Sequence, residues 1–405
     1  MRRVPWLALA VLAVVSLASA QDRPADDPER QVAPTAQAAE PPDPDEGFTD
    51  KVRQFAKTSP LLRRIFGDEE GVYLRFGGMI TGSGIALGPG YRRELANERL
   101  FVDVSAALST KLYKAVDANV RWLQVFDDRV QFWSSFRYAD FPQEDFFGIG
   151  PASSLDMRTN YDIDSIDVGT RGLVHVTPWL ELGATVGYYT PSIGSGSDDN
   201  YPSIEEQFTD ATAPGLTEQP DYLTTAVYAD IDYRDRRGSP TRGGRYRVSF
   251  GTWNDVTLDD YDFHRFDADA AQFISVYPRH VIAAHVGLSY VNNETGHRVP
   301  FYFLPYVGGS DTVRGFREFR FRDENMLFGT LEYRYQAFPM IDLAAFADAG
   351  EVRPDWEDIG PGDLKTSFGF GVRVHSNSRM FIRLDYGFGG SEGSRIFFKL
   401  FSPSF

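Results

Sequence analysis

The 405-residue sequence contains no cysteine, and it has no long apolar run after its first 20 residues. Without cysteine it cannot form a disulfide framework, a thiolate zinc site, an iron–sulfur centre or a thiol nucleophile. A transmembrane helix needs about 20 apolar residues, so a mature protein built from membrane-spanning helices is excluded. Cations are outnumbered, with 41 Lys and Arg against 57 Asp and Glu and a net charge of −16. We expect no nucleic-acid partner, because no general positive charge is available for one.

Aromatic residues and glycine, by contrast, are plentiful: 14% of the residues are aromatic and 37 are glycine. The hydrophobic fraction of 42% and the mean hydropathy of −0.32 look like those of a soluble protein. A transmembrane β-barrel has similar averages, because its strands alternate apolar and polar residues. The composition therefore leaves a soluble protein of several domains and a transmembrane barrel as alternatives.

The N-terminus has the three parts of a secretory signal peptide. Residues 2–3 are positively charged, residues 4–17 are apolar, and residues 18–20, Ala-Ser-Ala, form a small-residue cleavage site. We predict that residues 1–20 are a signal peptide that is removed from the mature protein.

Two segments precede the main part of the chain. Residues 21–47 are acidic, rich in proline and without an aromatic residue, so we predict a disordered linker. Residues 48–70 form a short amphipathic lead-in with basic residues between apolar ones. Such a segment can lie on a membrane surface or plug a lumen. A helix packed on the end of the next domain explains it equally well.

Beyond the lead-in, apolar and polar residues alternate in segments separated by Gly, Pro, Asp and Asn, as in β-strands. In residues 222–234, for example, Leu223 and Val227 share one face and Asp230 lies on the other. A soluble sandwich alternates in the same way. Here, however, the apolar faces carry almost no charge over the length of a tilted membrane strand, and the polar faces carry both signs, as in a wet lumen.

We therefore predict that residues 71–405 form an all-β fold, a 16-stranded antiparallel transmembrane β-barrel. An even strand number permits closure, which removes the exposed sheet edges. The predicted strands are residues 72–80, 84–92, 100–109, 112–124, 129–139, 163–176, 179–190, 222–234, 244–253, 262–275, 280–291, 326–336, 341–350, 366–375, 379–388 and 394–401. Surface loops are predicted at residues 140–160, 191–221 and 292–325.

Two segments of the predicted barrel carry distinctive motifs. Residues 308–316 read Gly-Gly-Ser-Asp-Thr-Val-Arg-Gly-Phe, between the eleventh and twelfth strands, and residues 346–350 read Phe-Ala-Asp-Ala-Gly on the thirteenth. Alternation directs Phe346 and Asp348 inward. These segments resemble the VRGF and Phe-x-Asp-x-Gly motifs of the outer-membrane assembly-factor superfamily, the bacterial surface antigen family, which includes BamA, TamA and two-partner-secretion transporters. The resemblance implies that the VRGF loop inserts into the lumen, where its arginine meets the aspartate.

The resemblance thus implies a lock that holds the loop in the lumen. A guanidinium in a confined lumen needs a fixed carboxylate, and the arginine fork pairs with one directionally. Gly315 is expected to allow a tight backbone at the loop tip. Whether the lock only holds the loop or also takes part in gating stays open. Its residues are Val313, Arg314, Gly315, Phe316, Glu332, Phe346, Asp348 and Gly350.

Other segments match the same family in the expected order along the chain. These are residues 145–150, 232–235, 240–243, 369–373 and 383–387. Members of the BamA type carry periplasmic POTRA domains ahead of the barrel. Roughly fifty, largely polar residues between the signal peptide and the first strand are too few for such a domain. We expect a barrel-only member that lacks POTRA domains.

The resemblance implies an integral barrel of the bacterial cell outer membrane that acts in outer-membrane protein assembly or insertion, or in polypeptide translocation. A passive or plugged pore, or a structural barrel, is the alternative. The expected partners are outer-membrane lipids, both lipopolysaccharide and phospholipid, with nascent outer-membrane proteins or a periplasmic protein. No nucleophile elbow, P-loop or metal-spaced histidine pair occurs. We accordingly expect no catalytic, cofactor-binding or metal-binding residue, no cofactor and no enzyme activity.

Overall fold

The computed structural model describes residues 70–80, 82–96, 99–125, 129–376 and 379–400, which all belong to one compact unit. The predicted signal peptide and linker, the lead-in except Glu70, and the last five residues of the predicted barrel lie outside the described residues. No described helix is long and apolar enough to cross a membrane.

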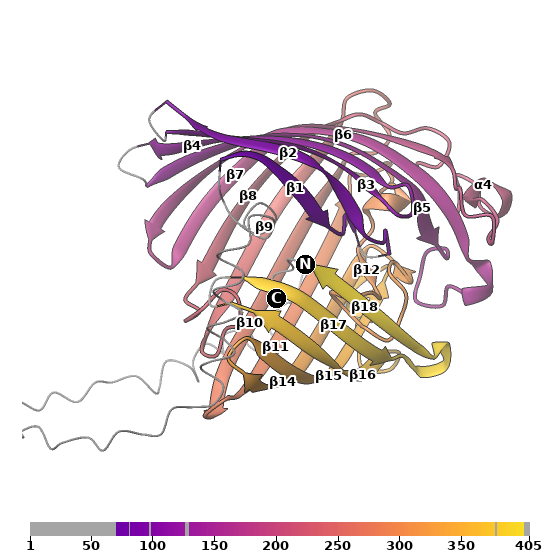
Figure 1. Ribbon diagram of the computed structural model, residues 1–405. Helices are drawn as coiled ribbons and strands as arrows, with labels where there is room; N and C mark the ends of the chain where they lie inside the picture. Colours follow the sequence, from indigo (N-terminus) through magenta and orange to yellow (C-terminus); the bar gives the residue numbers. More distant parts are fainter. Residues whose placement is uncertain (1–69, 81, 97–98, 126–128, 377–378, 401–405) are drawn as a thin grey trace, which may run out of the picture. The chain divides into compact units, whose positions relative to one another are not determined.

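Sixteen strands form one antiparallel sheet in which neighbours in sequence are neighbours in space, so the predicted all-β, 16-stranded fold is confirmed (Figure 1). The one interruption is that β14 pairs with β11, because β12 and β13 lie in the loop between them. The sheet consists of β1 (Gly71–Gly77), β2 (Ala86–Leu95), β3 (Leu100–Ser109), β4 (Lys114–Val125), β5 (Val130–Phe146), β6 (Thr159–Thr177), β7 (Leu180–Ser195), β8 (Tyr222–Asp232), β9 (Gly243–Asp255), β10 (Phe263–Tyr277), β11 (His280–Asn293), β14 (Asn325–Phe338), β15 (Ile341–Arg353), β16 (Lys365–His375), β17 (Met380–Phe388) and β18 (Ser394–Leu400). The loops contain β12 (Tyr306–Val307), β13 (Phe321–Arg322), the helix α4 (Ile204–Gln207) and the 3-10 helices η1 (Leu155–Met157), η2 (Phe301–Phe303), η3 (Trp356–Asp358) and η4 (Gly390–Glu392).

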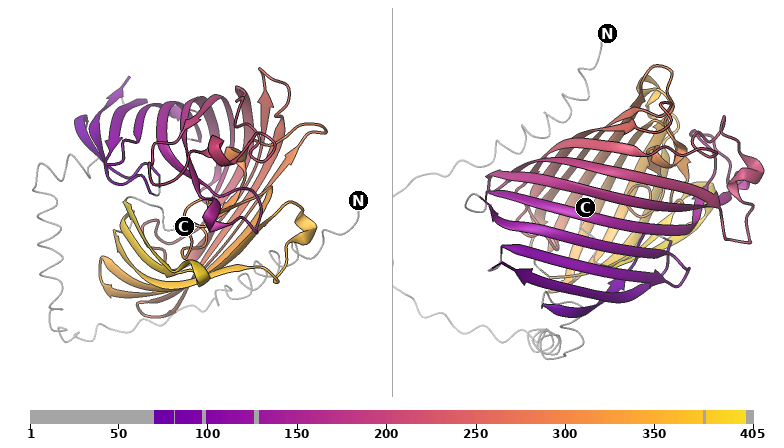
Figure 2. Two further views of the ribbon diagram at one scale, coloured as in Figure 1. Left: turned by 90° about the vertical axis from the view of Figure 1, so that its right-hand side faces the viewer. Right: turned by 90° about the horizontal axis from the view of Figure 1, so that it is seen from above.

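The sheet curls into a nearly closed barrel whose first and last strands face each other (Figure 2). Within the described residues no ladder of hydrogen bonds joins β1 to β18. Both strands are only seven residues long. The barrel therefore has a seam at which two short strand edges remain.

Alternation along each strand separates an apolar outer surface from a polar interior. On β8, Val227 is 57% exposed while its neighbour Tyr228 is 7% exposed. The same contrast holds on β14, where Leu331 is exposed and Glu332 is completely buried. Large exposed apolar side chains occur on the outward faces of strands all around the sheet. Exposed apolar side chains in this pattern form a surface for lipid.

Strands β5 and β6 are longer than predicted, with 17 and 19 residues. The loop predicted at residues 140–160 is therefore limited to residues 147–158. The alternation fails after residue 139 because the register shifts between Phe141 and Glu144, yet pairing resumes as far as Phe146 with Thr159. Phe146 and Tyr161 of this extension form a buried cluster with Phe301 of the loop after β11.

The two ends of the barrel differ in their connections. At one end, named the short-turn end, strands are joined by turns such as residues 178–179 and 339–340. At the other, named the long-loop end, lie residues 147–158, 196–221 and 294–324. In bacterial barrels the short turns face the periplasm and the long loops face outward. By this rule the short-turn end is the periplasmic end.

Placing a charge on the outer surface should destabilise the barrel in a bilayer. Val227 lies in the middle of β8, so Val227→Arg should lower the free energy of unfolding by about 2–4 kcal/mol. Denaturant titration of protein in phospholipid vesicles, followed by tryptophan fluorescence, measures this. Ala226→Arg is the matched control because its side chain faces the interior beside Thr185 and Gly251. Its loss should stay within about 0.5 kcal/mol. Equal losses for both variants would contradict the assignment of the two faces.

Candidate functional site: a buried ionic network beneath the β11–β14 loop

The loop of residues 294–324, named the inner loop, contains a small hairpin in which β12 pairs with β13. Thr312 closes the turn of this hairpin, since its hydroxyl accepts the amide of Gly308 at 2.9 Å and donates to the same residue's carbonyl at 3.0 Å. Apolar side chains of the loop, including Val313 and Phe316, form a buried cluster with Val352 of β15. The loop is thus folded on itself and packed on the barrel wall.

The glycines at the turn of the inner loop are Gly308 and Gly309, whereas the prediction placed the tight backbone at Gly315. Gly308 (115°) and Gly309 (96°) have positive φ angles and begin the turn that Thr312 closes. Gly315 was predicted to allow a tight turn, but it packs on the backbone of β17 and the residues after it. A Cβ on Gly315 would lie 2.3 Å from Cα of Gly389. Any larger side chain would therefore push the loop away from the wall.

Arg314 is 1% exposed and lies against inward-facing side chains of β14 and β15. Its Nε and Nη2 donate to the two oxygens of Asp348 at 3.0 and 2.7 Å, and its backbone amide donates to Asp348 at 3.0 Å. Nη1 donates to Glu332 at 2.8 Å. The guanidinium carbon lies 3.4 Å from the centre of the Phe346 ring. Side-on pairing of this kind fixes both the position and the orientation of the guanidinium.

Asp348 also accepts hydrogen bonds from side chains of both neighbouring strands. Thr330 of β14 donates its hydroxyl to Asp348 at 3.1 Å, and Ser367 of β16 donates at 2.9 Å. These three residues are direct neighbours in the register of the sheet. The carboxylate is therefore positioned by the barrel wall before the loop contributes anything.

The pair belongs to a larger group of charges that reaches β17. Glu332 accepts from Arg334 at 2.7 Å and from Arg373 at 2.9 Å. Asp385 pairs with Arg373 and Arg383, each at 2.7 Å, and lies 3.6 Å from Nη1 of Arg314. Arg383 also donates to the carbonyl of Ser310 in the inner loop at 2.8 Å. We name these seven charged residues the ionic network: Arg314, Glu332, Arg334, Asp348, Arg373, Arg383 and Asp385.

A second set of contacts holds the inner loop to the β5–β6 loop, to β6 and to the connection between β17 and β18. Arg320 donates to Ser153 of the β5–β6 loop at 3.0 Å and pairs with Glu392 near β18 at 2.6 Å. Arg322 donates to the hydroxyl of Tyr161 on β6 at 3.3 Å, and its carbonyl accepts the amide of Gly150 at 2.7 Å. Residues 145–150, which matched a family motif, therefore contact the inner loop.

The structure brings the eight predicted lock residues together. Gly350 lies under Val313, where a Cβ would meet the valine side chain at 3.1 Å. Sequence reasoning missed the participation of Arg373, Arg383 and Asp385, although their motifs were noted. A usable signal was present, because alternation places all three inward, Arg373 on the strand next to Asp348 and the other two on the following strand.

Glu318 is a polar residue of the inner loop that lies outside the strands. Burial raises the pKa of its carboxyl group to about 7, and the nearby charge of Asp311 adds to this shift. Tyr306 donates its hydroxyl to Glu318 at 3.2 Å. Burial also acts on Asp311, but Lys399 and Arg383 outweigh it and hold the pKa of Asp311 below its usual range.

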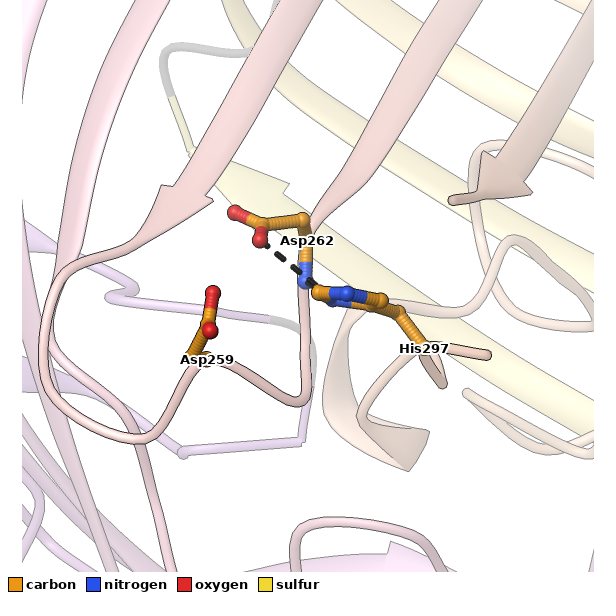
Figure 3. Close-up of side chains that lie close together, drawn as sticks. All are labelled: Asp259, Asp262 and His297. Atoms are coloured by element: carbon orange, nitrogen blue, oxygen red, sulfur yellow. Dashed lines mark hydrogen bonds and ion pairs between the residues drawn. The ribbon is translucent and has the colours of Figure 1, made fainter. Parts of the chain in front are cut away.

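Two groups of side chains outside the ionic network lie close enough together to approach a single cation. One consists of Asp259, Asp262 and His297 in the long loops (Figure 3). Nδ1 of His297 accepts the backbone amide of Asp262 at 3.2 Å, so that nitrogen is already engaged. The other group contains Asp140, which pairs with Lys114. At least one member of each group is thus engaged by a hydrogen bond or an ion pair within the protein.

Comparison with known proteins identifies the family. Residues 101–400 match the Omp85 superfamily domain. The chain belongs to the Omp85 superfamily. This confirms the predicted outer-membrane assembly-factor family, and the protein is a bacterial outer-membrane protein.

Solved structures show the same fold at low sequence identity. BamA from Haemophilus ducreyi lacking POTRA domains 1–3 superimposes with a TM-score of 0.60 at 14% identity, over 83% of this chain and 70% of that one. CdiB from Acinetobacter baumannii gives 0.52 at 12% identity, over 82% and 60%. CdiB from Escherichia coli gives 0.52 at 12%, over 81% and 61%. This chain therefore spans less than two thirds of either CdiB.

Truncating either partner of the Arg314–Asp348 ion pair should lower the free energy of unfolding strongly. The losses caused by the two truncations should not add. Asp348→Ala strands a buried guanidinium and Arg314→Ala strands buried carboxylates, so each should lower the free energy of unfolding by about 3–5 kcal/mol. The double variant should lose clearly less than the sum. Denaturant titration in detergent micelles measures all three values. Arg237→Ala, whose side chain is 80% exposed, is the control and should change little. Additive losses would show that Arg314 and Asp348 are not coupled.

Glu318 should make the folded barrel less stable as the pH rises. Its folded pKa of about 7 exceeds the ordinary unfolded value of about 4.3. The protonated form therefore stabilises the fold at low pH, and this contribution is lost as the pH rises towards and through 7. Glu318→Gln should be more stable than the wild type at pH 8, with a difference that shrinks towards pH 5.

The temperature at which the folded form disappears from unheated gels, measured at pH 5, 6, 7 and 8, tests this expectation. Glu357→Gln in the β15–β16 loop is the control, because its side chain is exposed. A constant difference between Glu318→Gln and the wild type at all four pH values would contradict the role of the buried carboxyl.

Proposed function

We propose that this barrel assists the assembly or insertion of outer-membrane proteins, or moves polypeptide across the outer membrane. The observation that carries the proposal is the seam, where the edges of β1 and β18 remain unpaired within the described residues. An unpaired strand edge presents backbone donors and acceptors to another strand. Strand addition to such an edge is a general way of binding an extended peptide.

A cavity of about 570 Å³ lies at this seam and supports the proposal. It is lined by Gly78 and Ile85 around the β1–β2 connection, by Glu318 of the inner loop, and by Phe398 and Leu400 of β18. Its lining therefore combines both free edges with the loop that the ionic network fixes. A strand that added to either edge would enter a space that already exists.

The inner loop connects the ionic network to the last strand. Asp311 pairs with Lys399 of β18 and lies 3.8 Å from Arg383 of β17. We propose that the predicted lock residues hold the loop within the barrel and so determine how β18 is presented at the seam. Loss of Arg314 or Asp348 would then affect strand addition through the position of the loop.

Outer-membrane lipid on the apolar outer surface and a nascent outer-membrane protein at the seam are the partners that fit this function. A periplasmic protein that delivers the nascent chain is a further expected partner. The alternative remains a plugged pore or a structural barrel. The inner loop favours this alternative. It contacts both β5–β6 and β14–β18 and so crosses between opposite parts of the wall.

Joining the two edges should abolish the proposed activity. Gly78→Cys with Leu400→Cys places one thiol on each side of the seam, and the natural chain has no cysteine to compete. A bismaleimide with a disulfide spacer should link them and stop the barrel from accelerating the folding of a second outer-membrane protein into vesicles. Reduction of the spacer should restore the activity.

The matched control pairs Gly78→Cys with Ile85→Cys, which line the same cavity but belong to one strand connection. Linking these two should leave the activity intact. Full activity of the seam-linked protein would rule out strand addition at the seam. Large, steady channels in planar bilayers, with no effect on folding of the second protein, would favour the pore.

A further inference from the structure

A second large cavity, of about 610 Å³, lies inside the barrel at the short-turn end. Its walls are inward-facing side chains of β4 to β9, completed by the turns after β6, β8 and β16. Seven arginines line it against three carboxylates, although the whole chain has a net charge of −16. Positive charge is therefore concentrated at one place in an acidic protein. We name this space the arginine cavity.

Two of the three carboxylates of the arginine cavity are already neutralised by its arginines. Asp230 pairs with Arg245 at 2.5 Å and with Arg247 at 3.2 Å. Asp232 holds Arg234 with two hydrogen bonds of 2.8 Å. The third carboxylate, which belongs to Glu181, accepts the hydroxyl of a tyrosine at 2.8 Å. Two of the three carboxylates are therefore already paired with arginines.

Arg121 and Arg171 form no ion pair with any residue that the structure describes. Arg121 instead lies over aromatic rings, 4.6 Å from the ring centre of Phe101 and 5.4 Å from that of Trp133. Arg171 lies 5.7 Å from the ring centre of Tyr228. Stacking leaves the guanidinium N–H groups free for an external acceptor.

The register of the sheet fixes how these two arginines are arranged. Arg121 on β4 is opposite Trp133 on β5, and Trp133 is opposite Arg171 on β6. The indole is held by a hydrogen bond of 3.1 Å to Asn119. Adjacent strands lie about 4.8 Å apart, so the two arginine backbones are about 10 Å apart. Their head groups lie over different rings, that of Arg121 over Phe101 and Trp133 and that of Arg171 over Tyr228.

This spacing distinguishes between kinds of anion. A single phosphate group is bound best when several donors converge on it, whereas the two free guanidiniums here lie over separate rings and belong to strands on either side of β5. An extended chain with carboxylates at intervals can meet them one at a time, each through a bidentate fork. The aromatic rings between them offer surfaces for the apolar parts of such a chain.

We propose that the arginine cavity binds an extended acidic polypeptide segment that enters the barrel from the short-turn end. The proposal deepens the proposed function, on which it rests, because it names an acidic stretch of a client polypeptide as the ligand. Arg121 and Arg171 supply the free positive charges, and the arginines already paired with Asp230 and Asp232 supply a rim.

The test measures binding by the full chain refolded in detergent, independently of any assembly activity. The probe is a fluorescein-labelled peptide of ten glutamates, and the same peptide of ten glutamines is its uncharged counterpart. Fluorescence anisotropy should show saturable binding of the glutamate peptide alone, weakening as salt is raised. The double variant Arg121→Gln/Arg171→Gln should bind at least about tenfold more weakly.

Arg137→Gln is the matched control, since Arg137 is a lumen arginine of β5 whose side chain is 42% exposed and which does not line the cavity. It should bind as the wild type does. Arg121→Lys/Arg171→Lys keeps the charges and should recover part of the affinity. Heat-modifiable mobility on gels establishes that each variant folds, which is expected because neither arginine is needed to neutralise a carboxylate.

Unchanged peptide binding in the double glutamine variant would overturn the proposal, and so would absence of binding to the wild type. Displacement of the peptide by inorganic pyrophosphate at equal charge concentration would also overturn it, and would indicate a compact phosphate site instead. Full activity of the seam-linked protein, in contrast, would overturn the proposed function. It would not change the affinity measured for the peptide.

Discussion

The burial of one guanidinium, that of Arg314, constrains the rest of this barrel. A buried arginine without carboxylate partners costs several kcal/mol, and a buried carboxylate without a cation costs as much. Arg314 meets this condition because three strands contribute acids, Glu332, Asp348 and Asp385, at one height. The acids in turn need Arg373 and its neighbours. Because the loop contributes only Arg314 to the ionic network, the other charges of the network must already be positioned by the barrel wall.

The wall makes room for these charges with small residues. Gly371 of β16 faces the interior, and a Cβ there would lie 2.4 Å from Asp385 and 2.6 Å from Arg373. A side chain at this position would displace the ion pair. The apolar outer surface imposes the opposite requirement on the alternate positions of the same strand, such as Phe370, which is exposed. One strand thus satisfies lipid and a dry ionic network by alternation alone.

The features of the barrel that could be predicted are those that depend on residues close together in sequence. Alternation has a period of two residues, so strands and inward positions such as Asp348 could be assigned from sequence alone. The pairing of Arg314 with Asp348 came from a resemblance, since the two lie 34 residues apart and no local pattern connects them. The contact of Arg320 with Ser153, across 167 residues, had neither kind of signal. The extension of β5 was missed because the register shift after Phe141 interrupts the alternation.

Charged side chains have different roles in the two interior regions, the ionic network and the arginine cavity. In the ionic network every acid pairs with at least one arginine, from the inner loop or from a strand, so the charges serve to fix the inner loop. In the arginine cavity the carboxylates of Asp230 and Asp232 pair with arginines in the same manner, yet Arg121 and Arg171 have no acidic partner among the residues that the structure describes. A charge left unpaired in an otherwise saturated interior has to stay hydrated or receive a ligand. The two regions contain the same residue types and differ in whether each charge has a partner. This difference separates a structural cluster from a binding site in this barrel.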